Sequence, residues 1–183
     1  SSKVISDRKH KLKSIEEQLK HFYYPVYTNL LRENVIFGNL LSIYCNKKCT
    51  KHIKKDENSI VSAEGFNIDI QNDIPASETE SNKTILLELD KEILAIHLET
   101  QKLIQDNLIL INPNDEFMKL LLSYDKHTTV YNILRKIYKN EIIQNLKYPT
   151  SFDAKYPDGL LLHVTTELNK LRTEIDLIHN SLV

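Results

Sequence analysis

Glycine is scarce in this chain, with only three among 183 residues, beside five prolines and no tryptophan. Because tight turns and hairpins depend on glycine, a chain with so little of it contains few of them. The scarcity favours long helices joined by few loops. Hydrophobic residues at 41% and charged residues at 27% exclude wholesale disorder. We therefore expect one all-α domain over residues 1–183.

Three other features are missing. Two cysteines are too few for a secreted disulfide scaffold, and no secretory signal is visible. A net charge of −1 and a pI near 6.6 do not support non-specific electrostatic binding of nucleic acid. No apolar run reaches the ~18 residues of a membrane helix. The sequence therefore predicts a cytoplasmic chain with no nucleic-acid partner.

The start of the chain is basic and carries no methionine. Positive charge of this kind lies just inside the cytoplasmic face when a membrane helix precedes it. The alternative is the solvated end of a charged helix. We expect that a membrane is a possible partner through a preceding segment, at its inner face. The basic residues are Lys3, Arg8, Lys9, Lys11 and Lys13.

A long first helix is predicted over residues 7–45, because apolar residues recur there at spacings of three and four. Pro25 lies in its middle, within "LKHFYYPVYTNLL". No residue just before Pro25 could cap a new helix, so we predict one helix kinked at Pro25. Proline lacks an amide hydrogen, and its ring displaces the carbonyl of His21. That carbonyl is then available to a tyrosine hydroxyl or a water.

Three further helices are predicted, over residues 85–107, 113–140 and 157–181, each with a regular apolar seam. Their starts follow the usual signals: a cap at Thr84 or Asn82, Asn112 before Pro113, and Pro157. Four long helices with one seam each predict an antiparallel four-helix bundle.

A polar excursion, residues 46–84, separates the first two predicted helices. It is basic in its first part and acidic later, and a connection of this length is either functional or disordered. The alternating "FNIDI" could form a strand in an isolated ribbon. We interpret the whole segment as a mobile excursion.

A histidine and several tyrosines are the candidate binding residues. His127 lies on an apolar seam one turn from Tyr124 and from Tyr131. It is either a ligand, acid or base inside the bundle, or a core histidine bonded to a tyrosine. Tyr24 and Tyr27 flank Pro25 and complete a possible small-ligand site near the kink. Tyrosines of this kind also serve as ordinary core residues.

Metal and catalytic signals are weak. Cys45, Cys49 and His52 have helical spacing that would point all three the same way, but a structural zinc site needs four ligands. His97 and His163 lie beside their seams, without the repeated Glu-x-x-His pairs of di-iron bundles. No phosphate loop, nucleophile elbow or metalloprotease motif occurs. We predict no cofactor, and we lean against enzymatic activity.

The order of short motifs resembles a family of uncharacterised bacterial proteins with one N-terminal membrane helix and a cytoplasmic helical domain. The motifs are "FYYPVY" from Phe22 to Tyr27, "LILINPND", "HTTVY" from His127 to Tyr131, and "YPDGLL" from Tyr156. The resemblance covers most of the chain except residues 46–84. It implies a membrane tether before Ser1 and no known activity.

These observations lead to two functional hypotheses. The first is a helical regulatory or interaction domain that binds a protein partner, displayed at the cytoplasmic face of a membrane. The second is a helical bundle that senses a small ligand or a metal through a cluster of histidine and tyrosine side chains. An enzyme with unfamiliar chemistry is a third reading. The oligomeric state is left open.

Overall fold

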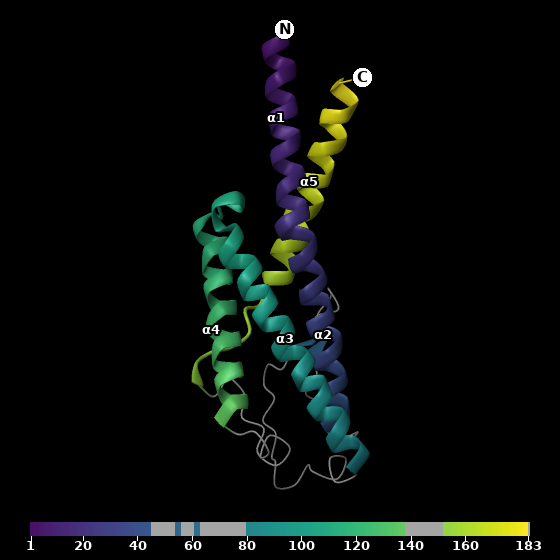
Figure 1. Cartoon of the computed structure of the whole chain (residues 1–183), viewed down its shortest axis with the longest axis vertical. Helices are drawn as coiled ribbons and strands as arrows, with labels where there is room; N and C mark the ends of the chain where they lie inside the picture. The colour runs from purple at the N-terminus through teal and green to yellow at the C-terminus, as the bar shows by residue number, and fades with distance from the viewer. Residues whose placement is uncertain (45–53, 56–60, 63–79, 138–151, 183) are drawn as a thin grey trace.

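A computed structural model describes residues 1–44, 54–55, 61–62, 80–137 and 152–182, and these are nearly all helical. The elements are α1 (Ser2–Gln18), a π-helical turn η1 (Leu19–Tyr23), α2 (Tyr24–Tyr44), β1 (Lys54–Lys55), β2 (Val61–Ser62), α3 (Glu80–Ile111), α4 (Asp115–Ile137) and α5 (Leu160–Leu182). The segments α1, η1 and α2 follow one another without a break and form one long rod (Figure 1). The prediction of an all-helical chain with four long helices is confirmed for the described residues.

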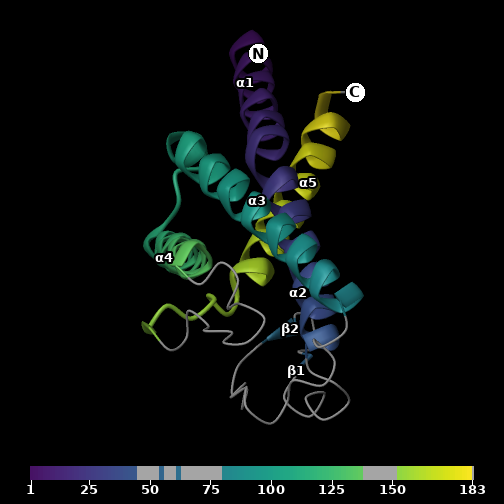
Figure 2. The same cartoon turned by 60° about the horizontal axis from the view of Figure 1, so that its bottom comes forward.

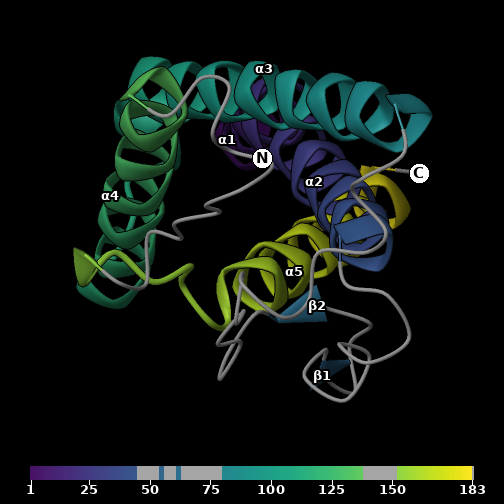
Figure 3. The ribbon, with the colours of Figure 1, turned by 90° about the horizontal axis from the view of Figure 1, so that it is seen from below.

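The helices pack around the long rod. Helix α3 lies along α2, and α5 packs on α1, η1 and α2. Helix α4 contacts α3 and α5 and stands to one side of the rod, which the turned view makes clear (Figure 2). Seen from below, α2 lies between α3 and α5 (Figure 3). A regular antiparallel bundle remains a prediction.

A short β pair occurs within the predicted polar excursion. Lys54 pairs with Ser62 and Lys55 with Val61, in antiparallel register. A two-residue ladder of this kind adds little stability alone. The "FNIDI" segment, where we expected a strand, lies outside the described residues.

The π turn explains how a proline lies inside one continuous helix. The Tyr24 amide donates to the Leu19 carbonyl, five residues back, so the turn is wider than in an α-helix. Pro25 cannot donate to His21, and the His21 carbonyl instead accepts from Asn107 Nδ2 on α3 at 3.2 Å. The expected partner was a tyrosine hydroxyl or a water; an amide from α3 takes that place.

Asparagines set the boundary between α3 and α4. Asn112 adopts a positive φ of 42°, which ends α3 because a left-handed residue cannot continue the helix. Asn114 then caps α4, its Oδ1 accepting from the Phe117 amide at 2.8 Å. The predicted start at residue 113, with Asn112 as the cap, is therefore wrong, and α4 begins at Asp115.

The other helix ends also differ from the predicted ones. Gly159 has a φ of +87°, so α5 begins after it, at Leu160, and not at Pro157. Helix α3 begins at Glu80, so Thr84 lies inside it and does not cap it. The first helix begins at Ser2, where the Ser1 hydroxyl accepts from the Val4 amide.

Candidate functional site in the core of three helices

A buried carboxylate, Glu33 of α2, links three helices. Its Oε1 lies 2.8 Å from His97 Nε2 on α3, and its Oε2 accepts from the Tyr124 hydroxyl on α4 at 3.1 Å. Asn132 Oδ1 of α4 lies 3.0 Å from the other ring nitrogen of His97. Glu33 and His97 are both buried. Each ring nitrogen of His97 faces an acceptor oxygen, as buried polar groups require.

A second buried carboxylate, Asp90 of α3, holds the far end of α4. Its Oδ1 accepts from the Tyr131 hydroxyl at 2.7 Å and from Arg135 Nε at 2.8 Å. Arg135 Nη2 also donates to the Tyr131 oxygen, and its guanidinium lies 4.3 Å from the Tyr131 ring centroid. Burial, with Asp90 as a further cause, raises the pKa of Tyr131, which keeps its hydroxyl protonated as a donor.

His127 packs beside this network as a neutral ring. Burial, with a smaller contribution from the neighbouring His97, lowers its pKa to about 4, although the hydrogen bond to the Ala154 carbonyl acts in the opposite direction. Its Nδ1 lies 2.8 Å from the Ala154 carbonyl, which can only accept, so Nδ1 carries the proton. The ring centroids of His127 and His97 are 6.2 Å apart. The Nε2 atom of His127 therefore carries no proton at neutral pH.

Tyr156 completes the cluster from the segment before α5. Its ring meets Tyr124 edge-to-face at 5.9 Å and His127 at 5.2 Å between centroids. Its hydroxyl is buried and has no hydrogen-bond partner among the described residues. Burial is the main cause that raises the pKa of Tyr156 and of Tyr124. The negative charge of Glu33 raises the pKa of both tyrosines further. Both phenols therefore stay neutral beside the carboxylate.

The structure brings together three of the five predicted binding residues. His127, Tyr124 and Tyr131 lie on α4 and share the network around His97. Tyr24 is instead 43% exposed on the outer side of the rod, and Tyr27 packs half-buried against the core. The predicted site around Pro25 is thus divided into an inner cluster on α4 and an outer surface at Tyr24.

Sequence reasoning missed the charged members of the cluster, Glu33, Asp90 and Arg135, and gave His97 no role of this kind. One signal was available. Asp90 and His97 are seven residues apart and flank Ile93, which places both on the buried face of α3. Polar residues repeated at that spacing on an apolar seam predict buried partners on a facing helix.

In the part of the chain that the structure describes, no group of three or more His, Cys, Asp or Glu side chains is placed so that it could hold a metal ion. The candidates Cys45, Cys49 and His52 lie outside the described residues. His163 stacks on Phe117, with 4.3 Å between ring centroids, and does not join the His97 cluster.

The cluster can do two things chemically. It holds a buried ion pair between Asp90 and Arg135, and it holds ionisable groups in contact across α2, α3 and α4. Buried charges of this kind fix which residues face one another, because a shifted helix would leave a charge unpaired.

Comparisons with known proteins give no relative: no protein family, curated protein or solved structure matches this chain. Over the described residues, no helix has both the length and the apolar character that crossing a membrane requires.

We predict that Tyr131→Phe lowers the free energy of unfolding by about 2 kcal/mol, because it removes two hydrogen bonds to charged groups. Tyr27→Phe serves as the matched control, since the Tyr27 hydroxyl makes no hydrogen bond to the described residues; its effect should stay below about 0.5 kcal/mol. Urea denaturation of both variants measures the difference. Equal losses would contradict the role of Asp90 and Arg135 as partners.

We also predict a pH dependence from His127. Its pKa is about 4 in the folded state and about 6.5 in the unfolded chain, so its contribution is fully present above pH 6.5. As pH falls below 6.5, only the unfolded state gains the proton, and about 2 to 3 kcal/mol is lost on approaching pH 4.

His127→Gln, which keeps a donor for the Ala154 carbonyl, tests this dependence. Urea denaturation at about pH 7 and about pH 4.5 gives the loss of stability for each protein. The variant should lose about 2 kcal/mol less than the original protein over this interval. An identical loss in both would show that His127 titrates normally.

Proposed function

We propose that this chain is a helical regulatory or interaction domain that works at the cytoplasmic face of a membrane. In this proposal α1 lies against the anionic lipid surface, and the remaining helices present surfaces to a protein partner. The observation that carries the proposal is the exposed, basic start of α1.

The first turns of α1 are exposed on every side, from Ser1 to Lys11. They project beyond α3 and α4 (Figures 1 and 2). Four basic residues, Lys3, Arg8, Lys9 and Lys11, occur there against the single carboxylate of Asp7. Val4 and Ile5 add exposed apolar side chains. Each basic residue close to an anionic leaflet contributes about 1 kcal/mol of attraction.

Exposed apolar residues on α3 and α4 support the interaction part of the proposal. Ile109 is 97% exposed and lies eleven residues after Leu98, which is also exposed, so both lie on one face of α3. Leu122 and Ile137 are exposed on α4. In this proposal a protein partner covers these exposed apolar side chains.

We further infer that the four helices form an antiparallel four-helix bundle. The polar contacts of Glu33 with α3 and α4 support this arrangement, as does the packing of α5 on α1.

We predict that the chain sediments with vesicles containing phosphatidylserine at low salt and is released at high salt. The triple variant Lys3→Glu, Lys9→Glu, Lys13→Glu should bind about a hundredfold more weakly, because three attractive charges become repulsive. Co-sedimentation at increasing lipid concentration measures the affinity.

The matched control reverses three exposed lysines elsewhere, Lys102, Lys119 and Lys136. It changes the net charge equally and should keep most of the lipid affinity. Equal weakening in both triple variants, or no binding by the original chain, would contradict the orientation of α1 toward the lipid.

A further inference from the structure

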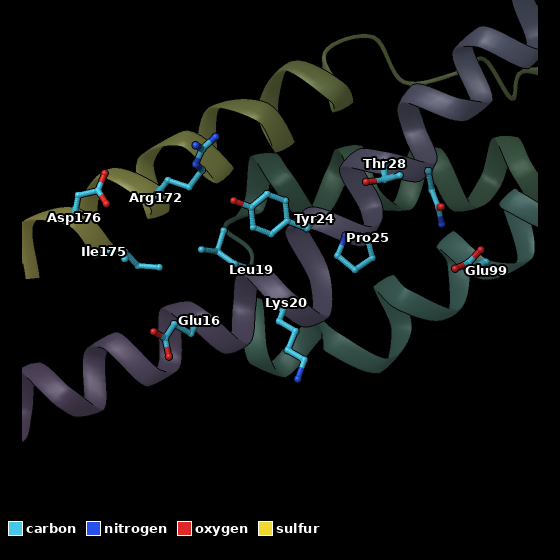
Figure 4. Close-up of a pocket in the computed structure, with 11 residues that line it drawn as sticks. Glu16, Leu19, Lys20, Tyr24, Pro25, Thr28, Glu99, Arg172, Ile175 and Asp176 are labelled. Atoms are coloured by element: carbon cyan, nitrogen blue, oxygen red, sulfur yellow. The ribbon is translucent and has the colours of Figure 1, made fainter. Parts of the chain in front are cut away.

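Charged side chains occupy two kinds of environment in this fold. Those around the π turn line an open groove and are exposed to water. They are Glu16, Lys20, Glu99, Arg172 and Asp176 (Figure 4). The contact between Glu33 and His97 is different, because both side chains are more than nine-tenths buried. Without water, each proton there must be held between a protein donor and a protein acceptor.

Both ring nitrogens of His97 face an oxygen atom. Nε2 lies 2.8 Å from Glu33 Oε1, and Nδ1 lies 3.0 Å from Asn132 Oδ1. A neutral imidazole has one N–H donor and one lone pair, so it can donate to only one of these oxygens. An imidazolium donates from both nitrogens. The observed contacts therefore fit the doubly protonated ring.

The Glu33 carboxylate gives a second, independent reason for the proton. Burying a carboxylate is costly unless a cation lies beside it, and His97 is its one ion-pair partner among the described residues. Tyr124 donates to the other carboxylate oxygen but carries no charge. The nearby cation, Arg135, is already paired with Asp90. A second proton on the ring balances the charge of Glu33.

The other titratable groups that face His97 come from α4 and from the segment before α5. Tyr131 meets the ring edge-to-face with 4.9 Å between centroids, and Tyr124 and His127 lie at 6.3 and 6.2 Å. Tyr156 packs on Tyr124 and His127. Burial raises the pKa of each of the three phenols and lowers the pKa of His127 to about 4, so all four groups are neutral. None of them supplies a charge beside the His97 ring.

Loss of one proton would reverse the contact with Asn132. A His97 ring that keeps only its Nε2 proton has a lone pair at Nδ1, which needs a donor and not an oxygen. Turning over the Asn132 side-chain amide brings Nδ2 to that place as a donor. Asn132 is half-buried and makes no other side-chain hydrogen bond to the described residues, so this turn breaks no other contact.

We propose that His97 carries a proton on both ring nitrogens and that Asn132 is a switch linked to that second proton. When the ring is doubly protonated, the Asn132 oxygen accepts from it. When one proton leaves, the amide turns over and donates to the ring. The switch lies where α2, α3 and α4 meet, so the protonation of one ring sets the polar contact between α3 and α4. It does not depend on lipid binding, so a failure of the proposed function leaves it standing.

Long-range proton–nitrogen NMR of the full chain at neutral pH reports the protons on each ring nitrogen directly. The two nitrogens of an imidazolium have similar chemical shifts, whereas the unprotonated nitrogen of a neutral ring is displaced far downfield. We expect similar shifts for the two nitrogens of His97, whose signals the variant His97→Gln identifies. His127 is the internal reference for a neutral ring. As the pH is raised, the side-chain amide signals of Asn132 should change together with those of the His97 ring.

Asn132→Leu separates the two forms, because its effect has opposite signs for them. If Asn132 accepts from the ring, the variant should lower the pH at which His97 loses its second proton by about one unit. If the Asn132 amide instead donates to a neutral ring, the variant should raise that pH. Asn180→Leu, at an exposed position on α5, is the matched control and should leave that pH unchanged. Thermal denaturation checks that each variant is folded.

Three results would overturn the proposal. The first is a spectrum of the original chain in which one nitrogen of His97 is unprotonated at neutral pH, and this result needs no variant. The second is a folded Asn132→Leu chain in which the pH of proton loss rises or stays the same. The third is a titration in which the Asn132 amide signals do not follow those of His97.

Discussion

The cost of burying the Glu33 carboxylate is the constraint on which much of this structure depends. A carboxylate removed from water needs partners for both oxygens, and Glu33 finds them on two different helices: His97 on α3 and Tyr124 on α4. Any sliding or rotation of α3 or α4 against α2 would break one of these contacts. The apolar seams stabilise the packing of the helices, and the contacts of the Glu33 carboxylate determine which residues face one another.

Charged groups in the inner cluster have partners, whereas several charged groups at the surface do not. Inside, Asp90 meets Arg135 and Glu33 meets His97, so charged groups have partners. Outside, at the π turn, Arg172 and Asp176 face water without partners in the described part of the chain. Satisfied buried networks rigidify a core, whereas exposed charges are solvated by water. The inner cluster therefore contributes to the stability of the fold and fixes which residues face one another.

The residues that share a face of one helix could be predicted from the sequence, whereas the contacts between helices could not. Helical periodicity places residues on one face of one helix, so Tyr124, His127 and Tyr131 were correctly grouped on α4. It says nothing about which face of another helix they meet, so Glu33 and Asp90 were missed and Tyr24 was wrongly placed beside them. The ends of α3 and α5 depended on positive φ at Asn112 and Gly159, which capping preferences alone did not locate.

A double-mutant cycle between Glu33 and His97 tests the central claim most directly. Urea denaturation of Glu33→Gln, of His97→Gln and of the double variant gives the energy with which the two residues depend on each other. The account predicts that the double variant is more stable than the sum of the single losses implies, by about 2 kcal/mol, because each single change leaves the other group buried without its partner. Losses that simply add would show that the carboxylate does not determine how the helices meet.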